Sequence, residues 1–321
     1  MKITNNFLLL PPSTRSTVST LTEAGNSIQD AEKTVKVTGI TNVHYATVNS
    51  LSSFILDGLT CIERAHPDTF QNLDAVIVIS QTYDQRLPSI STRIQNKFGL
   101  DRGVYCIDVM DGCNGYVKAL SLAEMLQIRG HQRILIVAGD LNSLMTEKAE
   151  TGTKILFGDG ISVTILAATQ KENKSLIYND GDFNDIISCS IADNVLNMNG
   201  FEVFWFTKNV VPGAVKTFLL ENDETLDNYD LLALHQASAL IVNSLASTLK
   251  YRNQFGSDFA CARIGNLGAG SIGAWLSQQN LPLGKDLKML VVGYGSGLSW
   301  GVASTVINLK QNEVIHVDTK N

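Results

Sequence analysis

The sequence lacks the patterns that mark several common classes of protein. It has no Cys-x-x-Cys pair and no cluster of cysteine with histidine, which argues against a zinc site. No Gly-x-Gly-x-x-Gly opens a helix after the first apolar run, and Gly-Lys-Ser/Thr is absent, which argues against a nucleotide-binding loop. No apolar stretch reaches the length that spans a bilayer, so we expect no membrane segment.

Charged residues are also scarce. They make up 17% of the chain and the net charge is −6, which argues against binding to nucleic acid through a basic surface. The same balance gives no overall attraction to an acidic partner protein, so the docking of such a partner would need a local basic patch.

The cysteines indicate the compartment. Their number is odd and their spacing is wide, which favours free thiols in a reducing environment (Cys61, Cys106, Cys113, Cys189 and Cys261). The apolar run at residues 7–10 is too short for the core of a signal peptide and is better interpreted as a first strand. We therefore expect a cytoplasmic protein.

Short apolar runs alternate with segments of helical character. The runs are rich in Val, Ile and Leu without alternation, so each is expected to be a strand buried on both faces (75–79, 104–110, 133–138, 162–167, 231–234, 260–264, 289–292 and 303–309). Helices are predicted between them (50–65, 89–98, 117–128, 211–221 and 237–250). This pattern predicts a layered α/β fold with helices covering a central sheet.

A faint internal repeat divides the chain. Each half ends with an apolar strand, a Gly-x-Gly turn and a second apolar strand; in the first half the turn is Gly158-Asp159-Gly160. Two related halves imply a duplication with the active site between them. The polar stretch 169–174 is the predicted junction, which gives halves of residues 1–170 and 171–321 in one fused body, since no long linker separates them.

Cys113 is the first candidate catalytic residue. It lies in Asp111-Gly112-Cys113-Asn114-Gly115, between an apolar run and a helical segment. A strand that turns tightly into a helix places this thiol at the helix N-terminus, where the dipole and free backbone N–H groups favour a thiolate nucleophile. The alternative is a buried structural cysteine.

Two later segments offer partners for this thiol. His235 follows an apolar strand, and Asn266 lies in a glycine-rich turn between Gly265 and Gly268. A cysteine can accept an acyl group from a thioester, while His and Asn side chains can donate hydrogen bonds to a developing oxyanion. The alternatives are a packing histidine and a turn asparagine in the left-handed region.

The motifs, taken in order, resemble the ketoacyl synthase III family of the thiolase superfamily over nearly the whole chain. The matching stretches are 38–40, 88–89, 111–115, 157–160, 198–204, 235–237, 265–266 and 295–301. The resemblance implies the five-layered αβαβα thiolase fold, built from two duplicated halves, and a homodimer. The first half would carry the nucleophile, and the second half the His and Asn.

The resemblance also implies roles for single residues. Cys113 would carry the acyl group, and His235 with Asn266 would stabilise the enolate formed when a malonyl thioester loses carbon dioxide. The backbone N–H groups of Cys113 and of the turn at Ser296 would form an oxyanion hole. The family has a glycine where Ser296 stands, so a positive φ there would strain the chain. Leu87 would reach across the dimer into the partner's acyl pocket; the alternative is an ordinary core leucine.

The sequence departs from the family where thioester donors bind. A Trp and two Arg that hold the adenine of coenzyme A are matched by Lys33, Val37 and Thr151, and an Arg that docks the acyl carrier protein is matched by Leu240. None of these can supply the same stacking or guanidinium contacts. The resemblance is therefore to a divergent member, outside housekeeping fatty-acid synthesis.

Three functions remain open on the sequence alone. The first is a condensing enzyme that acylates Cys113 from acyl-coenzyme A or acyl carrier protein and extends the acyl group with a malonyl thioester, without cofactor or metal, in a specialised fatty-acid or secondary-metabolite pathway. The second is an acyltransferase that passes the acyl group to a hydroxyl or amine, with His235 as general base. The third is a non-catalytic subunit of a heteromer.

Overall fold

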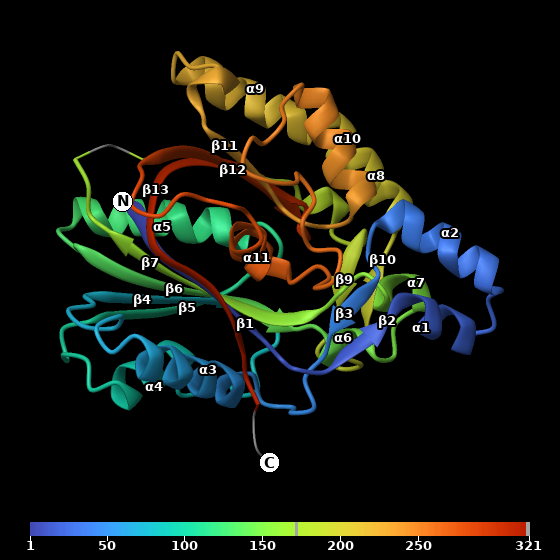
Figure 1. Cartoon of the computed structure of the whole chain (residues 1–321), viewed down its shortest axis with the longest axis horizontal. Helices are drawn as coiled ribbons and strands as arrows, with labels where there is room; N and C mark the ends of the chain where they lie inside the picture. The colour runs from blue at the N-terminus through green and yellow to red at the C-terminus, as the bar shows by residue number, and fades with distance from the viewer. Residues whose placement is uncertain (171–172, 319–321) are drawn as a thin grey trace.

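Two stacked sheets and three helical layers make up the computed structural model, which describes residues 1–170 and 173–318 (Figure 1). By hydrogen bonding, nine strands of the described residues form one continuous mixed sheet in the order β11-β12-β13-β1-β7-β6-β4-β5, with β8 on the side of β13. The strand bounds are β1 Lys2–Leu10, β4 Ala75–Ser80, β5 Tyr105–Met110, β6 Arg133–Leu141, β7 Asp159–Ala167, β8 Lys174–Asn179, β11 Leu231–Leu234, β12 Leu287–Gly295 and β13 Ser299–His316.

The same strand arrangement occurs twice, which agrees with the predicted duplication. In the first half β1 pairs antiparallel with β7, β7 antiparallel with β6, and β6 parallel with β4. In the second half β8, β13, β12 and β11 repeat this sequence of pairings. The C-terminal part of β13 pairs parallel with β1 and so joins the two sheets. The predicted boundary between residues 170 and 171 stays a prediction, since residues 171 and 172 of the junction lie outside the described residues.

Helices cover the outer faces and fill the space between the sheets (Figure 1). Helices α3 (Leu51–Ala65) and α4 (Ile90–Lys97) lie on the first sheet, and α8 (Gly200–Asn209), α9 (Val211–Glu221) and α10 (Ala239–Leu249) lie on the second. The middle layer is α5 (Gly115–Ile128) and α11 (Ser271–Ser277), whose apolar residues contact both sheets. The predicted five layers, α-β-α-β-α, are confirmed.

The remaining elements lie outside the main sheet and the helices that cover it. They are β2 Thr14–Ser16, α1 Thr17–Glu23, α2 Ile28–Thr38, β3 Asn42–His44, α6 Ser143–Thr146, α7 Thr151–Lys154, β9 Ile187–Cys189 and β10 Leu196–Met198, with 3₁₀ turns η1 Gly181–Phe183, η2 Leu226–Asn228 and η3 Gly268–Gly270. In the described ranges no helix combines the length and the apolar character that crossing a membrane requires. All five cysteines are unpaired.

Most predicted strands are present, and three expectations need correction. The run 260–264 is not a strand: its backbone forms turns such as Ile264 N–H to the Cys261 carbonyl (3.1 Å), and only Cys261 and Ile264 are buried, where they pack against β1. The segment 158–160 is not a turn, because Asp159 and Gly160 begin β7. Strand β5 is only partly buried, since it forms the end of the sheet.

Gly273 of α11 shows how tightly the middle layer is packed. A methyl group added there would lie 1.8 Å from Ser162 Oγ of β7 and 3.0 Å from Asn6 Oδ1 of β1. Both neighbours belong to strands that are paired with each other, so neither can move without disturbing the sheet.

We predict that Gly273→Ala lowers the free energy of unfolding by about 1–3 kcal/mol through overpacking. The matched control is Gly213→Ala in α9, where an added methyl group meets nothing within 4 Å. That change should be neutral or stabilising by about 0.5–1 kcal/mol, because alanine favours helix over glycine. Urea titration of both variants measures the difference; equal midpoints would contradict the prediction.

Candidate active site

A cavity of about 190 Å³ between the two halves brings the predicted catalytic residues together. Cys113 comes from the start of α5, His235 from the end of β11, Asn266 from the turn before η3 and Ser296 from the turn between β12 and β13. Leu87 does not line this cavity. Its side chain is 85% exposed, so the alternative of a core leucine is wrong and the predicted reach into a partner subunit stays a prediction.

Cys113 is held where the chain leaves β5 and enters α5. A methyl group added at Gly295 would lie 2.6 Å from Cys113 Cβ, so only glycine at 295 allows the turn after β12 to approach the nucleophile this closely. Asn114, the next residue, donates from Nδ2 to Ser299 Oγ of β13 at 2.9 Å. The thiol is therefore fixed between the two sheets.

The pKa of the Cys113 thiol is shifted opposite to the prediction. Burial raises it to about 12, with further contributions from the negative charges of Asp140 and Asp111. A hydrogen bond with the Asn266 side chain acts in the other direction, but it does not outweigh burial. Cys113 is therefore a thiol at neutral pH, and the expectation that the helix start favours a thiolate is wrong.

His235 is neutral and incompletely bonded. Burial lowers its pKa to about 3, and Nδ1 has no hydrogen-bond partner among the described residues. Its backbone carbonyl accepts a hydrogen bond from Tyr294 Oη at 2.7 Å, and the two rings meet edge to face at 5.2 Å. A packing histidine would have its ring nitrogens satisfied; this ring instead keeps hydrogen-bonding capacity beside the cavity.

Asn266 has a defined amide orientation. Its Oδ1 accepts from Gly268 N at 2.9 Å and from Ser271 Oγ at 3.0 Å. With the oxygen fixed in this way, Nδ2 is the atom left to donate toward Cys113. The positive φ angles of this turn belong to Gly265 (86°) and Gly268 (56°), so the alternative of an asparagine in the left-handed region is wrong.

The Ser296 substitution causes no backbone strain. Ser296 is absent from the residues with positive φ, whereas Gly297 has a φ of 137°. The glycine requirement of this turn therefore falls on position 297, and Ser296 keeps a backbone N–H at the cavity wall.

Three residues near the nucleophile escaped the sequence reading: Tyr294, Gln81 and Asp140. Tyr294 and Gln81 line the cavity, and Asp140 is fully buried behind it. Asp140 Oδ1 accepts from Ser80 Oγ (2.6 Å) and Gln81 N (2.6 Å), so it fixes the turn after β4. For two of them the sequence carried a signal: Gln81 and Asp140 follow shortly after the predicted apolar runs 75–79 and 133–138, where strands are expected to end.

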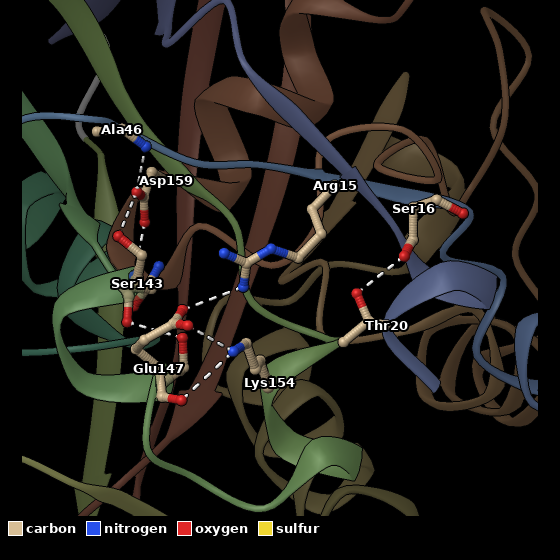
Figure 2. A network of polar contacts seen from close by, with 10 residues as sticks. Arg15, Ser16, Thr20, Ala46, Ser143, Glu147, Lys154 and Asp159 are labelled. Atoms are coloured by element: carbon tan, nitrogen blue, oxygen red, sulfur yellow. Dashed lines mark hydrogen bonds and ion pairs between the residues drawn. The ribbon is translucent and has the colours of Figure 1, made fainter. Parts of the chain in front are cut away.

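A second buried carboxylate supports the cavity wall (Figure 2). Asp159 accepts hydrogen bonds from Ser143 N (2.7 Å), Ser143 Oγ (2.6 Å) and Ala46 N (2.7 Å). It thereby ties the start of β7 to α6 and to the loop after β3. Asn142, which precedes α6 and lines the cavity, donates to the Gly158 carbonyl at 2.7 Å. The Gly-Asp-Gly segment is thus a support for the site.

Farther out, Glu147 links three segments of the same wall (Figure 2). It accepts from Arg15 at 3.1 Å and from Lys154 at 2.7 Å, so β2, α6 and α7 are held together. Met145 and Leu156, which line the cavity, lie two residues from Glu147 and from Lys154, respectively, in the sequence. The ion pairs therefore position the segment that forms this side of the cavity.

The positions matched to donor-binding residues differ in their placement. Val37 and Leu240 line the cavity and are about half exposed, at 54% and 45%. Lys33 lies on the exposed face of α2, where it pairs with Asp30 at 2.8 Å, and Thr151 lies in α7 outside the cavity lining. The entrance is consequently apolar, with two aliphatic side chains at its rim.

The thiol environment predicts a steep pH dependence. Below the pKa of Cys113 the thiolate fraction rises tenfold with each pH unit, so its alkylation by iodoacetamide should accelerate about tenfold per unit from about pH 7 to 10. Intact-protein mass spectrometry measures the rate, with Cys113→Ala as the background for the other thiols. A plateau within this range would contradict the prediction and indicate an activated thiolate.

Comparisons with known proteins agree with this site. The family description 3-oxoacyl-[acyl-carrier-protein] synthase III matches residues 107–181, and that of its C-terminal domain matches residues 219–307. A β-ketoacyl-[acyl-carrier-protein] synthase III of Lactococcus lactis subsp. cremoris is 30% identical over 294 residues, covering 85% of this chain and 89% of the relative. The enzyme of the same name from Ehrlichia canis is 27% identical over 284 residues, covering 83% and 88%.

Solved structures show the same fold. A 3-oxoacyl-(acyl-carrier protein) synthase from Burkholderia xenovorans superposes with a TM-score of 0.86 at 24% identity, over 98% of this chain and 96% of that one. The priming β-ketosynthase of the R1128 polyketide pathway superposes with a TM-score of 0.81 at 21% identity, over 96% of each chain. With a 30% identical relative spanning most of its length, the chain belongs to the β-ketoacyl-[acyl-carrier-protein] synthase III family of condensing enzymes, and it has the thiolase fold.

Proposed function

We propose that this protein acylates Cys113 and then condenses the acyl group with a malonyl thioester by decarboxylative Claisen chemistry. The observation that carries the proposal is the Asn266 amide. Its oxygen is held by Gly268 N and Ser271 Oγ, which leaves Nδ2 to donate into the cavity that also contains Cys113 and the neutral His235. Enolate stabilisation needs two such donors side by side.

In the first step the Cys113 sulfur attacks the carbonyl of an acyl thioester. The bond from the carbonyl to the donor sulfur breaks, and the donor leaves as a thiol that takes up the proton of Cys113. The backbone N–H groups of Cys113 and of the Ser296 turn would stabilise the oxyanion of the tetrahedral intermediate. Because the thiol pKa is high, proton transfer to the leaving sulfur accompanies acylation.

In the second step the malonyl thioester loses carbon dioxide. The electron pair of the broken C–C bond moves to the thioester oxygen, where the N–H groups of His235 and Asn266 would stabilise the enolate. The enolate carbon then attacks the acyl carbonyl on Cys113, the bond from that carbonyl to sulfur breaks, and the Cys113 thiolate takes up a proton from solvent. These side chains act as dipolar donors, so the scheme uses no cofactor and no metal.

The partners follow from the surface. Acyl-coenzyme A or an acyl carrier protein would present the thioester at an entrance bordered by Val37 and Leu240, which differs from an entrance built for a charged donor. This difference supports a specialised pathway.

A homodimer would pair the end strand β5, whose Met110 is 71% exposed, and bring Leu87 to the partner's site. Free thiols support a cytoplasmic location.

The two alternatives are less well supported. A plain acyltransferase needs a base to deprotonate an alcohol or amine, and a histidine whose pKa is lowered to about 3 is a weak base. A non-catalytic subunit has no need for Cys113, His235 and Asn266 to line one cavity.

Acyl transfer to Cys113 can be tested by intact-protein mass spectrometry with a panel of acyl-coenzyme A and acyl-carrier thioesters. We predict a mass gain that Cys113→Ala abolishes, and a malonyl thioester chase that removes it with release of carbon dioxide and a β-ketoacyl product. Discharge by an alcohol or amine, but not by malonyl thioester, would identify an acyltransferase. The absence of any gain would overturn the proposal.

The role of Asn266 is separable from that of Cys113. Asn266→Asp keeps the Oδ1 contacts but replaces the Nδ2 donor with an oxygen, so decarboxylation should slow by about 10²–10³-fold while acylation of Cys113 persists. Ser271→Ala is the matched control, because it removes one contact to Oδ1 and leaves the donor in place. Measured carbon dioxide release that is equal in the two variants would contradict the assignment.

A further inference from the structure

Gln81 stands at the boundary between the catalytic cavity and a neighbouring one. It follows β4, and its backbone N–H donates to Asp140 Oδ1 at 2.6 Å, so the turn that carries it is fixed from behind. Gln81 lines the cavity that holds Cys113, and it also lines an adjoining cavity of about 670 Å³. It is the residue common to both linings.

The Gln81 amide lies against the backbone just before the nucleophile. A methyl group added at Gly112 would come within 2.6 Å of Nε2 and 3.1 Å of Oε1 of Gln81. A methyl group added at Gly268, beside Asn266, would lie 4.0 Å from Nε2. The amide therefore reaches the space next to Cys113, where the first carbons of a bound acyl group must lie.

Hydrogen-bonding capacity distinguishes Gln81 from the other polar side chains of this cavity. Asn142 donates to the Gly158 carbonyl, Thr207 to the Val203 carbonyl and Thr38 to the Thr34 carbonyl. The Ser238 hydroxyl accepts from Ile241 N at the start of α10.

The Gln81 amide, in contrast, makes no hydrogen bond within residues 1–170 and 173–318, although it offers two donor hydrogens and an acceptor oxygen. Each of the other four side chains has part of its hydrogen-bonding capacity used within the protein, whereas the whole Gln81 amide is left for a ligand.

We infer that Gln81 recognises a polar group on the acyl chain carried by Cys113, so the acyl substrate bears a hydroxyl, carbonyl or amide group in place of a plain alkyl chain. The inference rests on the proposed acylation of Cys113. An alkyl chain would cover the amide and leave it unpaired, which costs affinity, whereas an oxygen-bearing chain would satisfy it.

The test compares coenzyme A thioesters of equal chain length: butanoyl against 2-hydroxybutanoyl, 3-hydroxybutanoyl and 3-oxobutanoyl. In each case the Cys113 sulfur gains the acyl group, and coenzyme A leaves as the thiol with the Cys113 proton. We expect the wild-type protein to acylate at least about tenfold faster with an oxygenated chain than with butanoyl. Intact-protein mass spectrometry against time gives each rate.

Gln81→Met retains the length of the side chain and removes the amide, so it should reduce that preference to near unity by slowing only the oxygenated donors. Gln85→Met is the matched control: the Gln85 amide donates to the Pro88 carbonyl at 3.0 Å, and it lines the adjoining cavity alone. Its preference should equal that of the wild type. Thermal melting and the Cys113 alkylation rate check that both variants keep the folded site.

Equal rates with butanoyl and all oxygenated donors, or a preference that survives Gln81→Met, would overturn the assignment while leaving the proposed function standing. A Cys113 that no thioester acylates would overturn both. The two failures are distinguishable because only the second abolishes the adduct.

Discussion

The burial of the start of α5 between the two sheets is the constraint on which the site depends. Gly115 lies against Ile79 of β4 and Ala269 of η3, where a methyl group would come within 2.5 and 3.2 Å. Gly295 leaves room for Cys113 on the other side. Because the helix start touches both sheets, the segments that carry Cys113, His235 and Asn266 are placed relative to one another by packing. Packing of this density resists displacement by even one methyl group.

The same burial determines the charge state of the site. It raises the pKa of the Cys113 thiol and lowers that of His235, so the cavity contains a neutral thiol and a neutral imidazole. No buried ion pair has to be maintained between them. In the proposed reaction negative charge appears only during turnover, and fixed dipoles are suited to stabilise it: the Asn266 amide, whose oxygen is held, and backbone N–H groups. Acyl transfer by such a site depends on preorganised donors more than on a standing thiolate.

The sequence predicted structure correctly where a local apolar pattern coincides with burial in the fold. Runs such as 231–234 became strands because both faces are covered, and the order of the motifs identified Cys113, His235 and Asn266. It failed at 260–264, where Cys261 and Ile264 are buried against β1 but the backbone forms turns instead of a strand. The direction of the Cys113 pKa shift was missed for the same reason: the helix-start argument is local, whereas desolvation comes from distant segments.

Residues that act through long-range contacts also escaped the sequence reading. Asp140 and Gln81 are 59 residues apart and meet only because β4 and β6 are neighbours. In these turns the backbone is held separately from the side chains, which explains where the sequence can change without moving the turns. The backbone of Gln81 is held by Asp140, and Gly297 carries the positive φ beside Ser296, so side chains at 81 and 296 can change without moving the turns that bear them. Val37 and Leu240 line the cavity and are about half exposed. Under the proposed function, substrate selectivity can therefore change at these positions while the donors around Cys113 stay in place.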